Sequence, residues 1–352
     1  MNITDSVLDH YGFERDEYTI EPFGSGLINN TWLVLKGSEK YILQKVNKNI
    51  FTNPLLIADN IEKIQAHLSV HDSHYFFTAP CKTLKGESIV HLSDDYYRMF
   101  PYVKGSHTID VVQSPQQAYE AASQFSRFTS VLSGLDISTL NITLPSFHDL
   151  SLRYVQFSDA LEKGNKERRK EANDLIEELK AYSAIVDEYN NIKNNNEFKL
   201  RVTHHDTKIS NVLLDDNHKG ICVIDLDTVM PGYFISDVGD MMRTYLCPVS
   251  EEEKDFSKIE VRDEFYFAIV NGYKAFMDDK LTETEKQYFF YSGEFMIYMQ
   301  AIRFLTDYIN DDVYYGSRYP KHNLVRATNQ SVLLKRLMEK GPLLASSQKI
   351  IL

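Results

Sequence analysis

The sequence has few cysteines and no pattern among them. Its 352 residues include three, Cys81, Cys222 and Cys247, which are scattered and odd in number. They form neither a Cys-x-x-Cys pair nor the even, closely spaced set of a disulfide framework. We therefore expect free, buried thiols in a reducing compartment.

Long apolar runs, a secretory leader and a surplus of basic residues are also missing. No apolar run approaches the roughly 18 residues that cross a bilayer, and the acidic start MNITDSVLDHYGFERDEY has no basic segment before an apolar stretch. The 38 basic and 50 acidic residues give a net charge of −12, which argues against a mainly electrostatic nucleic-acid binder. This negative charge is still compatible with a nucleotide ligand, because a bound Mg²⁺ and a few local cations can offset the charge of the phosphates. We expect a cytoplasmic protein without nucleic-acid or membrane partners.

The chain is long enough, and with 43% hydrophobic residues apolar enough, for two lobes. Glycine-containing turns between β-branched and aromatic runs predict an antiparallel sheet within residues 1–104, and Asn53-Pro54 predicts the start of a helix inside that region. The expected strands begin at Tyr18 and then cover Thr31–Leu35, Lys40–Val46, Glu87–Leu92 and Tyr96–Pro101.

After a connector near 100–105 the pattern becomes helical. Apolar residues at helical spacing run from Ala118 to Leu132, and residues after 237 are helical again. The charge-rich stretch 161–198 predicts a solvated helical pair with an exposed loop. This order predicts an α+β, bilobal fold, with a small strand-rich lobe at 1–104 and a larger, mainly helical lobe at 105–352.

Carboxylate, amide, lysine and histidine side chains are most concentrated in residues 203–227, THHDTKISNVLLDDNHKGICVIDLD. Two apolar runs, Asn211–Leu214 and Ile221–Ile224, predict short strands with polar residues at their ends. Phosphoryl transfer from ATP needs one carboxylate to orient or deprotonate an acceptor hydroxyl, and further oxygen ligands to hold Mg²⁺. The stretch contains side chains of both kinds.

The spacing suggests a role for each of these polar residues. Asp206 is expected to be the base, and Asn211, five residues on, an amide ligand of Mg²⁺. Asp225 is expected to be the main Mg²⁺ ligand, and Asp227 shares its strand face by period-two alternation as a candidate ligand of a second metal. Lys208 lies between base and amide, where its ammonium can approach the transferred phosphate. Hard oxygen ligands suit Mg²⁺, whereas a transition metal favours histidines.

Two other interpretations stay open on the residues alone. The aspartates also fit turn formers that cap buried strands. A His-Asp doublet such as His205-Asp206 also occurs in metal-dependent phosphohydrolases, which need further histidines on helices. One member of the His204-His205 pair is expected to bond the loop backbone, and His205, next to the base, is assigned to the acceptor.

Together these motifs resemble the aminoglycoside phosphotransferase and choline kinase-like superfamily, relatives of the protein kinases, and within it the bacterial N-acetylhexosamine 1-kinases. The catalytic-loop segments carry the superfamily assignment, and the two C-terminal segments carry the narrower one. The matching segments follow in order along the chain: GSGLINNTWLV (24–34), YILQKVN (41–47), HHDTKISNVLLD (204–215), VIDLDTVMPG (223–232), SDVGDMMR (236–243), RFLTDYINDDVYY (303–315) and HNLVRATNQ (322–330).

The resemblance implies ATP as co-substrate and Mg²⁺ as cofactor. It implies that the Gly24-Ser25-Gly26 turn lies over the nucleotide phosphates, where unhindered backbone N–H groups can approach oxygen. It also implies that the connector containing Phe100 and Tyr102 is the hinge that holds adenine.

The chain departs from the superfamily pattern at two positions. Where protein kinases have a phosphate-binding lysine on the third strand, the motif places Gln44 and not Lys45. Because neighbouring strand residues point to opposite faces, we expect Gln44 to face the nucleotide and the usual ion pair with Glu62 to be absent. At Leu27 the sugar-kinase pattern has a histidine, which would change the substrate preference if that side chain normally touches the sugar.

The acceptor side is expected on the helix from about 294 to 309. Gln300, Arg303 and Asp307 share one face of it, and charged and amide groups of this kind hold neutral sugars through paired hydrogen bonds. Arg303 also belongs to the resembling motif. Tyr314 and its neighbour Tyr315 are candidates for a wall against the sugar ring, with packing expected for at least one of them.

The resulting hypothesis is an ATP- and Mg-dependent kinase that phosphorylates the anomeric hydroxyl of an N-acetylhexosamine, GlcNAc or GalNAc. A kinase of another small alcohol, such as an aminoglycoside, choline, homoserine or another hexose, is the first alternative. A nucleotide-binding pseudokinase and the metal phosphohydrolase are alternatives of another class. The sequence leaves open the acceptor, the anomeric specificity, the nucleotide preference and whether the protein is a monomer or a dimer.

Overall fold

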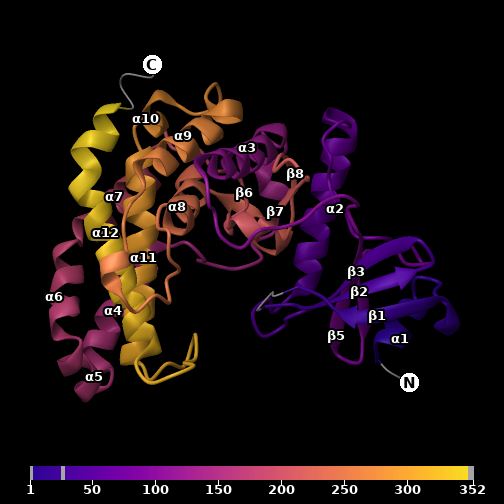
Figure 1. The fold of residues 1–352 in the computed structure, drawn as a ribbon, viewed down its shortest axis with the longest axis horizontal. Coiled ribbons are helices and arrows are strands. Elements are labelled where there is room, and N and C mark those ends of the chain that lie inside the picture. The colour runs from indigo at the N-terminus through magenta and orange to yellow at the C-terminus, as the bar shows by residue number, and fades with distance from the viewer. Residues whose placement is uncertain (1–2, 25–27, 348–352) are drawn as a thin grey trace.

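A computed structural model describes residues 3–24 and 28–347, and its mixed architecture confirms the predicted α+β fold class. Figure 1 shows a small sheet at one end of the molecule and a larger helical part at the other. Ser25 and Gly26 of the predicted phosphate-binding turn, and Leu27, where the sugar-kinase pattern has a histidine, lie outside the described residues.

The sheet is antiparallel, with strand order β1-β2-β3-β5-β4. Gln44 stands opposite Arg98 across the β3–β5 pair, and Lys45 stands opposite Tyr97. The strand expected from residue 87 begins only at Val90, because Thr83 and Glu87 close a turn through a backbone hydrogen bond of 2.8 Å. The strands are β1 Tyr18–Pro22, β2 Asn30–Lys36, β3 Glu39–Val46, β4 Val90–Leu92 and β5 Asp95–Pro101.

Two separate clusters of buried side chains form the interior. The smaller cluster joins the helix α1 (Ile3–Asp9) to the sheet, through residues such as Leu8, Leu43 and Met99. Helix α2 (Pro54–His71) begins with proline as predicted, yet its buried stripe belongs to the larger cluster, together with the helical lobe. Figure 1 shows α2 standing between the sheet and the helices. The core of the helical lobe therefore extends across the expected boundary near residue 104.

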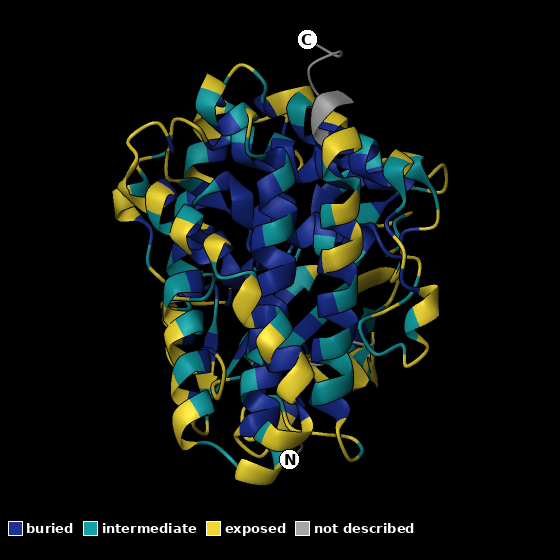
Figure 2. Ribbon diagram, turned by 90° about the vertical axis from the view of Figure 1, so that its left-hand side faces the viewer, coloured by how far each residue is buried: buried dark blue, intermediate teal, exposed yellow. Residues whose placement is uncertain are grey.

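The second lobe is built around the long helix α11, which packs against α12, α8 and α4. In Figure 2 the buried residues line the inward sides of these helices. The helices are α3 Pro115–Val131, α4 Leu150–Lys163, α5 Lys166–Glu171, α6 Asn173–Ala181, α7 Ala184–Asn194, α8 Phe234–Tyr245, α9 Asp263–Met277, α10 Glu283–Lys286, α11 Phe289–Ile309 and α12 His322–Ser347. Within the described ranges, none of the helices is both long and apolar enough to span a membrane.

The stretch 161–198 differs from the expected solvated pair. It forms the end of α4 and the three helices α5 to α7. Leu179 and Ile192 are fully buried, because α6 and α7 each turn an apolar stripe toward the core and a charged face toward solvent.

Two short antiparallel pairs carry the polar stretch of the second lobe. Strand β6 (Arg201–Thr203) pairs with β9 (Met230–Gly232), and β7 (Val212–Leu214) pairs with β8 (Gly220–Val223). The connector from the sheet lobe joins this unit, because His107 exchanges two backbone hydrogen bonds of 2.9 Å with Leu214. These hydrogen bonds join the segment after the predicted hinge to β7, the strand that follows the predicted catalytic loop.

Candidate active site

The loop that carries Asp206 is held by carboxylates of helix α8. Asp237 accepts backbone hydrogen bonds from His204 (3.0 Å) and His205 (2.7 Å), and Asp240 accepts one from Thr207 (2.8 Å). Burial raises the pKa of Asp237 to about 7, although the two backbone donors oppose the shift. No role was assigned to Asp237 and Asp240 from the sequence, although two aspartates three residues apart on this helix were an available signal.

Both histidines of the loop are buried and bonded to backbone oxygens. His204 Nε2 donates to the carbonyl of Ile224 at 2.9 Å, and His205 Nδ1 lies 3.1 Å and 3.2 Å from the carbonyls of Thr203 and Thr228. Burial lowers both pKa values, that of His205 to about 4, so both rings are neutral. The sequence analysis expected one structural histidine and placed His205 at the acceptor, but in this geometry both histidines hold the loop.

The conformation of His205 adds a second constraint on the loop. Its φ of 65° lies in the left-handed region, which non-glycine residues adopt at a cost. A Cβ on Gly232 would come within 2.5 Å of the His205 Nε2 atom, so this glycine leaves room for the ring. The loop is therefore fixed by packing from strand β9 as well as by hydrogen bonds.

Asp206 and Lys208 lie next to each other at the open side of this loop. The ammonium of Lys208 is 3.2 Å from a carboxylate oxygen of Asp206, and the Asp206 side chain is 20% exposed. Burial opposes the charge of Lys208, but Asp206 and Asp240 outweigh it and raise the lysine pKa. A partly exposed carboxylate beside a cation is suited to meet both an acceptor hydroxyl and a phosphate.

Asn211 and Asp225 offer oxygen atoms that suit Mg²⁺. The Asn211 amide nitrogen donates to the carbonyl of Asp206 at 2.9 Å, which leaves its oxygen as the free end. Asp225 is exposed, has a left-handed φ of 60°, and its carboxylate forms no hydrogen bond or ion pair within the described residues. Desolvation by the surrounding protein and the neighbouring carboxylates Asp227 and Asp206 raise its pKa to about 7. An amide oxygen and an unpaired carboxylate are hard ligands and fit Mg²⁺.

Asp227 is placed differently from the expectation. Strand β8 ends at Val223, and Asp227 lies in a short 3-10 turn (η4, Leu226–Thr228), so it does not share a strand face with Asp225. One of its oxygens is 2.5 Å from Arg98 and the other accepts from Asn29 at 2.9 Å. Within the described residues only the oxygen facing Asn29 accepts a hydrogen bond, while the other faces the Arg98 guanidinium, and with 2% exposure this carboxylate lies in a buried ion pair instead of an open metal site.

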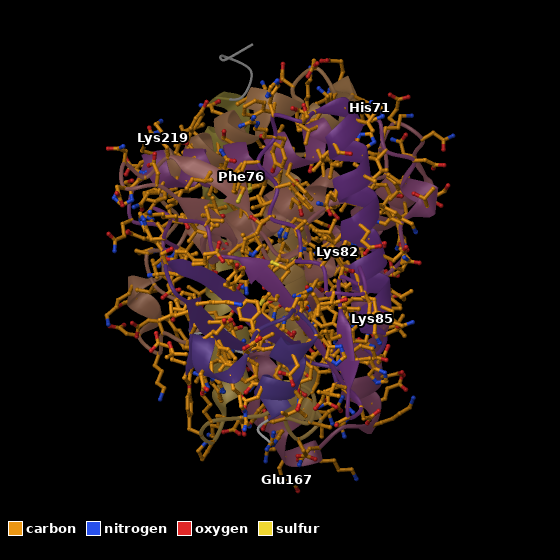
Figure 3. The ribbon with its side chains drawn as sticks, turned by 90° about the vertical axis from the view of Figure 1, so that its right-hand side faces the viewer. His71, Phe76, Lys82, Lys85, Glu167 and Lys219 are labelled. Carbon is orange, nitrogen blue, oxygen red and sulfur yellow. The ribbon has the colours of Figure 1, made fainter. Side chains whose placement is uncertain are left out.

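Gln44 and Lys45 point to opposite sides of β3. Gln44 accepts hydrogen bonds from Arg98 at 2.9 Å and 3.1 Å, whereas Lys45 pairs with Asp95 at 2.6 Å. Glu62 on α2 pairs with Lys82 instead of a β3 lysine, and Figure 3 shows Lys82 beside α2. The side of the sheet that faces Asp227 therefore carries Gln44 and the guanidinium of Arg98.

Tyr102 of the predicted hinge contacts both the start of β3 and the segment just after β1. The Tyr102 N–H donates to the carbonyl of Lys40 at 3.1 Å, so this N–H is not free for adenine. The Tyr102 ring meets Phe23 at 6.3 Å, and Arg98 lies 5.1 Å from the centre of the Phe100 ring. Gly24 has a φ of 78°, a conformation that suits glycine in the turn before the undescribed residues.

The residues of α11 that were predicted to bind the acceptor have different surroundings in the structure. Arg303 bonds Gln300 at 3.3 Å and lies 5.5 to 5.9 Å from the rings of Phe147, Tyr314 and Tyr315. Tyr314 is 70% exposed, whereas Tyr315 packs against the core. The guanidinium of Arg303 thus lies among aromatic rings at the surface of the helical lobe.

Asp307, predicted to bind the acceptor, is buried and saturated by donors. Its oxygens accept from the backbone N–H groups of Tyr314 (2.7 Å) and Tyr315 (2.9 Å) and from the Asn323 amide (3.0 Å). In this arrangement Asp307 positions the loop that carries Tyr314, and its carboxylate is not available to a sugar.

Two further residues near Arg303 were missed by the sequence analysis. His148 packs against the His205 ring at 5.3 Å, and its Nδ1 is buried without a hydrogen-bond partner. Burial lowers its pKa well below the usual value, with His205 and Arg303 acting in the same direction. Arg153 lies close enough to Arg303 that burial and this second guanidinium lower its pKa. Neither residue belongs to a motif, and only the fold brings them to α11.

The comparison with known proteins agrees with this architecture. The model of the phosphotransferase enzyme family, the aminoglycoside phosphotransferase type, matches residues 19–259. The chain therefore belongs to this phosphotransferase family. The members of this family are phosphotransferase enzymes.

Solved structures with the same fold cover almost the whole chain. An aminoglycoside phosphotransferase from Alicyclobacillus acidocaldarius matches with a TM-score of 0.66 at 12% identity, over 98% of this chain and 95% of its own. A spectinomycin phosphotransferase in complex with ADP and spectinomycin has a TM-score of 0.57 at 13% identity, over 99% and 97%. A choline/ethanolamine kinase family protein from Mesorhizobium loti has 0.55 at 13%, over 99% of both chains.

Proposed function

We propose that the protein is an ATP- and Mg-dependent kinase that phosphorylates the anomeric hydroxyl of an N-acetylhexosamine. The observation that supports the kinase activity best is the catalytic loop, in which a partly exposed Asp206 stands beside Lys208. The same loop presents the free oxygen of Asn211, and the following strand leads to the unpaired carboxylate of Asp225. The complex of the related spectinomycin phosphotransferase with ADP supports the use of a nucleotide.

The proposed reaction uses few groups, because phosphoryl transfer depends mostly on positioning and charge neutralisation. Asp206 accepts the proton of the anomeric hydroxyl, whose oxygen attacks the γ-phosphorus in line. The bond from that phosphorus to the β,γ-bridging oxygen breaks, which leaves ADP and the sugar 1-phosphate. Lys208 faces the transferred phosphoryl group from beside the base. Asn211 and Asp225 would hold Mg²⁺, which would supply neutralisation of the phosphate charge.

The charges around Arg303 favour a neutral sugar over a cationic acceptor. Within residues 3–24 and 28–347, neither Arg303 nor Arg153 forms an ion pair with a carboxylate. Asp307 is occupied by its three N–H donors. Guanidinium groups donate well to hydroxyl and acyl oxygens but repel an ammonium group. An aminoglycoside or choline acceptor, suggested by the names of the fold relatives, therefore suits this region less well.

The decisive experiment is a screen with ATP labelled at the γ-phosphate, run over N-acetylhexosamines, neutral hexoses, aminoglycosides and choline. We expect label in a sugar 1-phosphate with the wild-type protein. Asp206→Asn should lower the rate by about 10²- to 10⁴-fold, the usual contribution of a general base, and leave ATP affinity nearly unchanged.

The matched control is Asp216→Asn, an exposed aspartate in the turn between β7 and β8, which should behave as wild type. Near-normal turnover of Asp206→Asn would remove Asp206 as the base. Label that appears only in a cationic acceptor would replace the sugar by that acceptor.

A further inference from the structure

A buried ion pair connects the sheet lobe to the predicted metal site. A guanidinium nitrogen of Arg98 on β5 lies 2.5 Å from Asp227 in the turn η4, and the two side chains are only 4% and 2% exposed. In an antiparallel sheet with solvated edges, an arginine on an inner strand is unusual and needs a partner. Here the partner comes from the other lobe.

Both members of this pair also form hydrogen bonds with groups of the sheet lobe. Gln44 accepts from two nitrogens of Arg98, and Asn29 donates to the second oxygen of Asp227. Asn29 in turn accepts from the backbone N–H of Asn47 at 3.0 Å. Arg98 on β5, itself bonded to Gln44 on β3, and Asn29 just before β2 thus contact one carboxylate of the helical lobe.

Stability alone does not account for such an arrangement. Removing two charges from water costs several kcal/mol per ion, and apolar residues of similar volume often serve stability as well or better. A buried pair is explained more readily when it fixes the position of something else. The neighbouring feature that needs a fixed position is Asp225, two residues before Asp227, with an unpaired carboxylate on a left-handed backbone.

We propose that Arg98 is a positioning residue for Asp225, acting through Asp227. Arg98 touches neither the metal nor the substrates in this proposal. It sets the place of η4 relative to the sheet, and so the place at which the Asp225 carboxylate meets Mg²⁺. The inference rests on the proposed use of Mg²⁺ and nucleotide.

The proposal predicts a defect in metal use and not in acceptor use. In Arg98→Met, the Mg²⁺ concentration for half-maximal rate should rise about 10- to 100-fold, the range seen when residues that orient a metal ligand are changed. The KM for the acceptor should stay near wild type. Arg98→Lys keeps the charge but has no planar fork to reach Gln44 and Asp227 together, so partial recovery is expected.

A double variant separates positioning from simple destabilisation. Arg98→Met leaves Asp227 buried and uncompensated and should lower the midpoint of thermal unfolding. Adding Asp227→Leu removes that charge and should restore the midpoint, while the requirement for Mg²⁺ stays high. If the double variant regains both the midpoint and the wild-type Mg²⁺ requirement, the pair has no positioning role and the proposal is overturned.

The control uses an ion pair within the sheet, between Lys45 on β3 and Asp95 on β5. Lys45→Met breaks the partly exposed contact with Asp95 and should leave the Mg²⁺ requirement as in wild type. A Mg²⁺ titration in the presence of ADP, followed by calorimetry, gives a readout without turnover. Absence of binding to the wild-type protein would count against the proposed function itself. Equal Mg²⁺ affinity of wild type and Arg98→Met would count against the role of Arg98 alone.

Discussion

At the scale of single residues, the catalytic loop depends on buried polar groups whose partners are mostly backbone atoms. Asp237 holds the amides of His204 and His205, while the two imidazoles hold carbonyls of the neighbouring strands. Each interaction requires a fixed protonation state, because a charged imidazole without a counter-ion is costly in such a place. The loop that carries Asp206 should therefore be sensitive to acid.

His205→Asn tests this sensitivity. The pKa of His205 falls from 6.5 to about 4 on folding, so the unfolded chain binds more protons between these values and stability falls as pH falls through this window. The loss is on the order of 3 kcal/mol. Asn retains an N–H donor near the position of Nδ1 and tolerates a left-handed backbone. Between pH 7 and pH 4, the free energy of unfolding of the variant should therefore fall by about 3 kcal/mol less than that of the wild-type protein.

The readout is the difference between wild type and variant at each pH. The raised pKa of Asp237, about 7, acts in the opposite direction, because the folded chain then binds more protons than the unfolded chain in the same window. That contribution is common to both proteins and cancels in the difference. A difference that is constant from pH 7 to pH 4 would mean that His205 does not stay neutral in the folded protein.

Local chemistry predicted much of this site, and contacts between distant residues account for what was missed. Asp206, Asn211 and Asp225 lie on one short stretch, so order and spacing alone were enough to propose roles for them. The partner of Asp227 follows from no local pattern, because Asn29 is 198 positions away and only the fold joins them. The prediction that Asp227 shares a strand face with Asp225 was wrong, because it applied the two-residue period of a strand beyond the end of β8.

At the scale of elements, the end of α11 and the following loop form one unit through Asp307. Its carboxylate gathers two backbone N–H groups of the loop and the Asn323 amide of α12. Asn323 also reaches Asp312 at 2.9 Å and the carbonyl of Gly316 at 2.9 Å. The loop that presents Tyr314 beside Arg303 is therefore held from both helices.

Asp307→Ala should loosen this loop without touching the phosphate-transfer residues. The change leaves several buried donors without a partner and should cost on the order of 3 kcal/mol of stability, measured by denaturant unfolding. Because Tyr314 then moves freely, the KM for the acceptor should rise while the KM for ATP stays constant. The control is Asp311→Asn, whose side chain in the same loop is 60% exposed. A fall in kcat with an unchanged acceptor KM would contradict a role in positioning the loop.

The sequence was less informative about how elements group. The proline at the start of α2 and its apolar stripe predicted the helix itself. They did not tell which lobe buries that stripe, because periodicity identifies an apolar face and not its partner. The same limit explains 161–198, where charge density suggested a solvated pair although Leu179 and Ile192 are fully buried.

At the scale of the whole molecule, α2 belongs to the core of the helical lobe although it lies within the sheet lobe along the chain. Ile57, Ile61 and Ile64 are buried in the larger cluster of apolar side chains. The Asn60 amide donates to the carbonyls of Asn141 (2.9 Å) and Val229 (3.1 Å), and it accepts the N–H of Asn141. The sheet, in contrast, rests on the smaller cluster with α1.

This division predicts how the native protein opens. Amide hydrogen exchange should show β1, β2 and β3 exchanging with a lower opening free energy than α8 and α11, because the sheet buries fewer apolar side chains. The amides of α2 should exchange with α8 and α11 and not with the strands next to them in sequence.

Asn60→Ala leaves buried backbone groups without partners, costs about 1–3 kcal/mol of stability, and should lower the protection of α2 selectively. Asn49→Ala, at an exposed position before α2, is the matched control. If α2 instead exchanges together with β2 and β3 in the wild-type protein, the sheet lobe and α2 open as one unit, and the boundary near residue 104 describes the folding units better than the two buried clusters do.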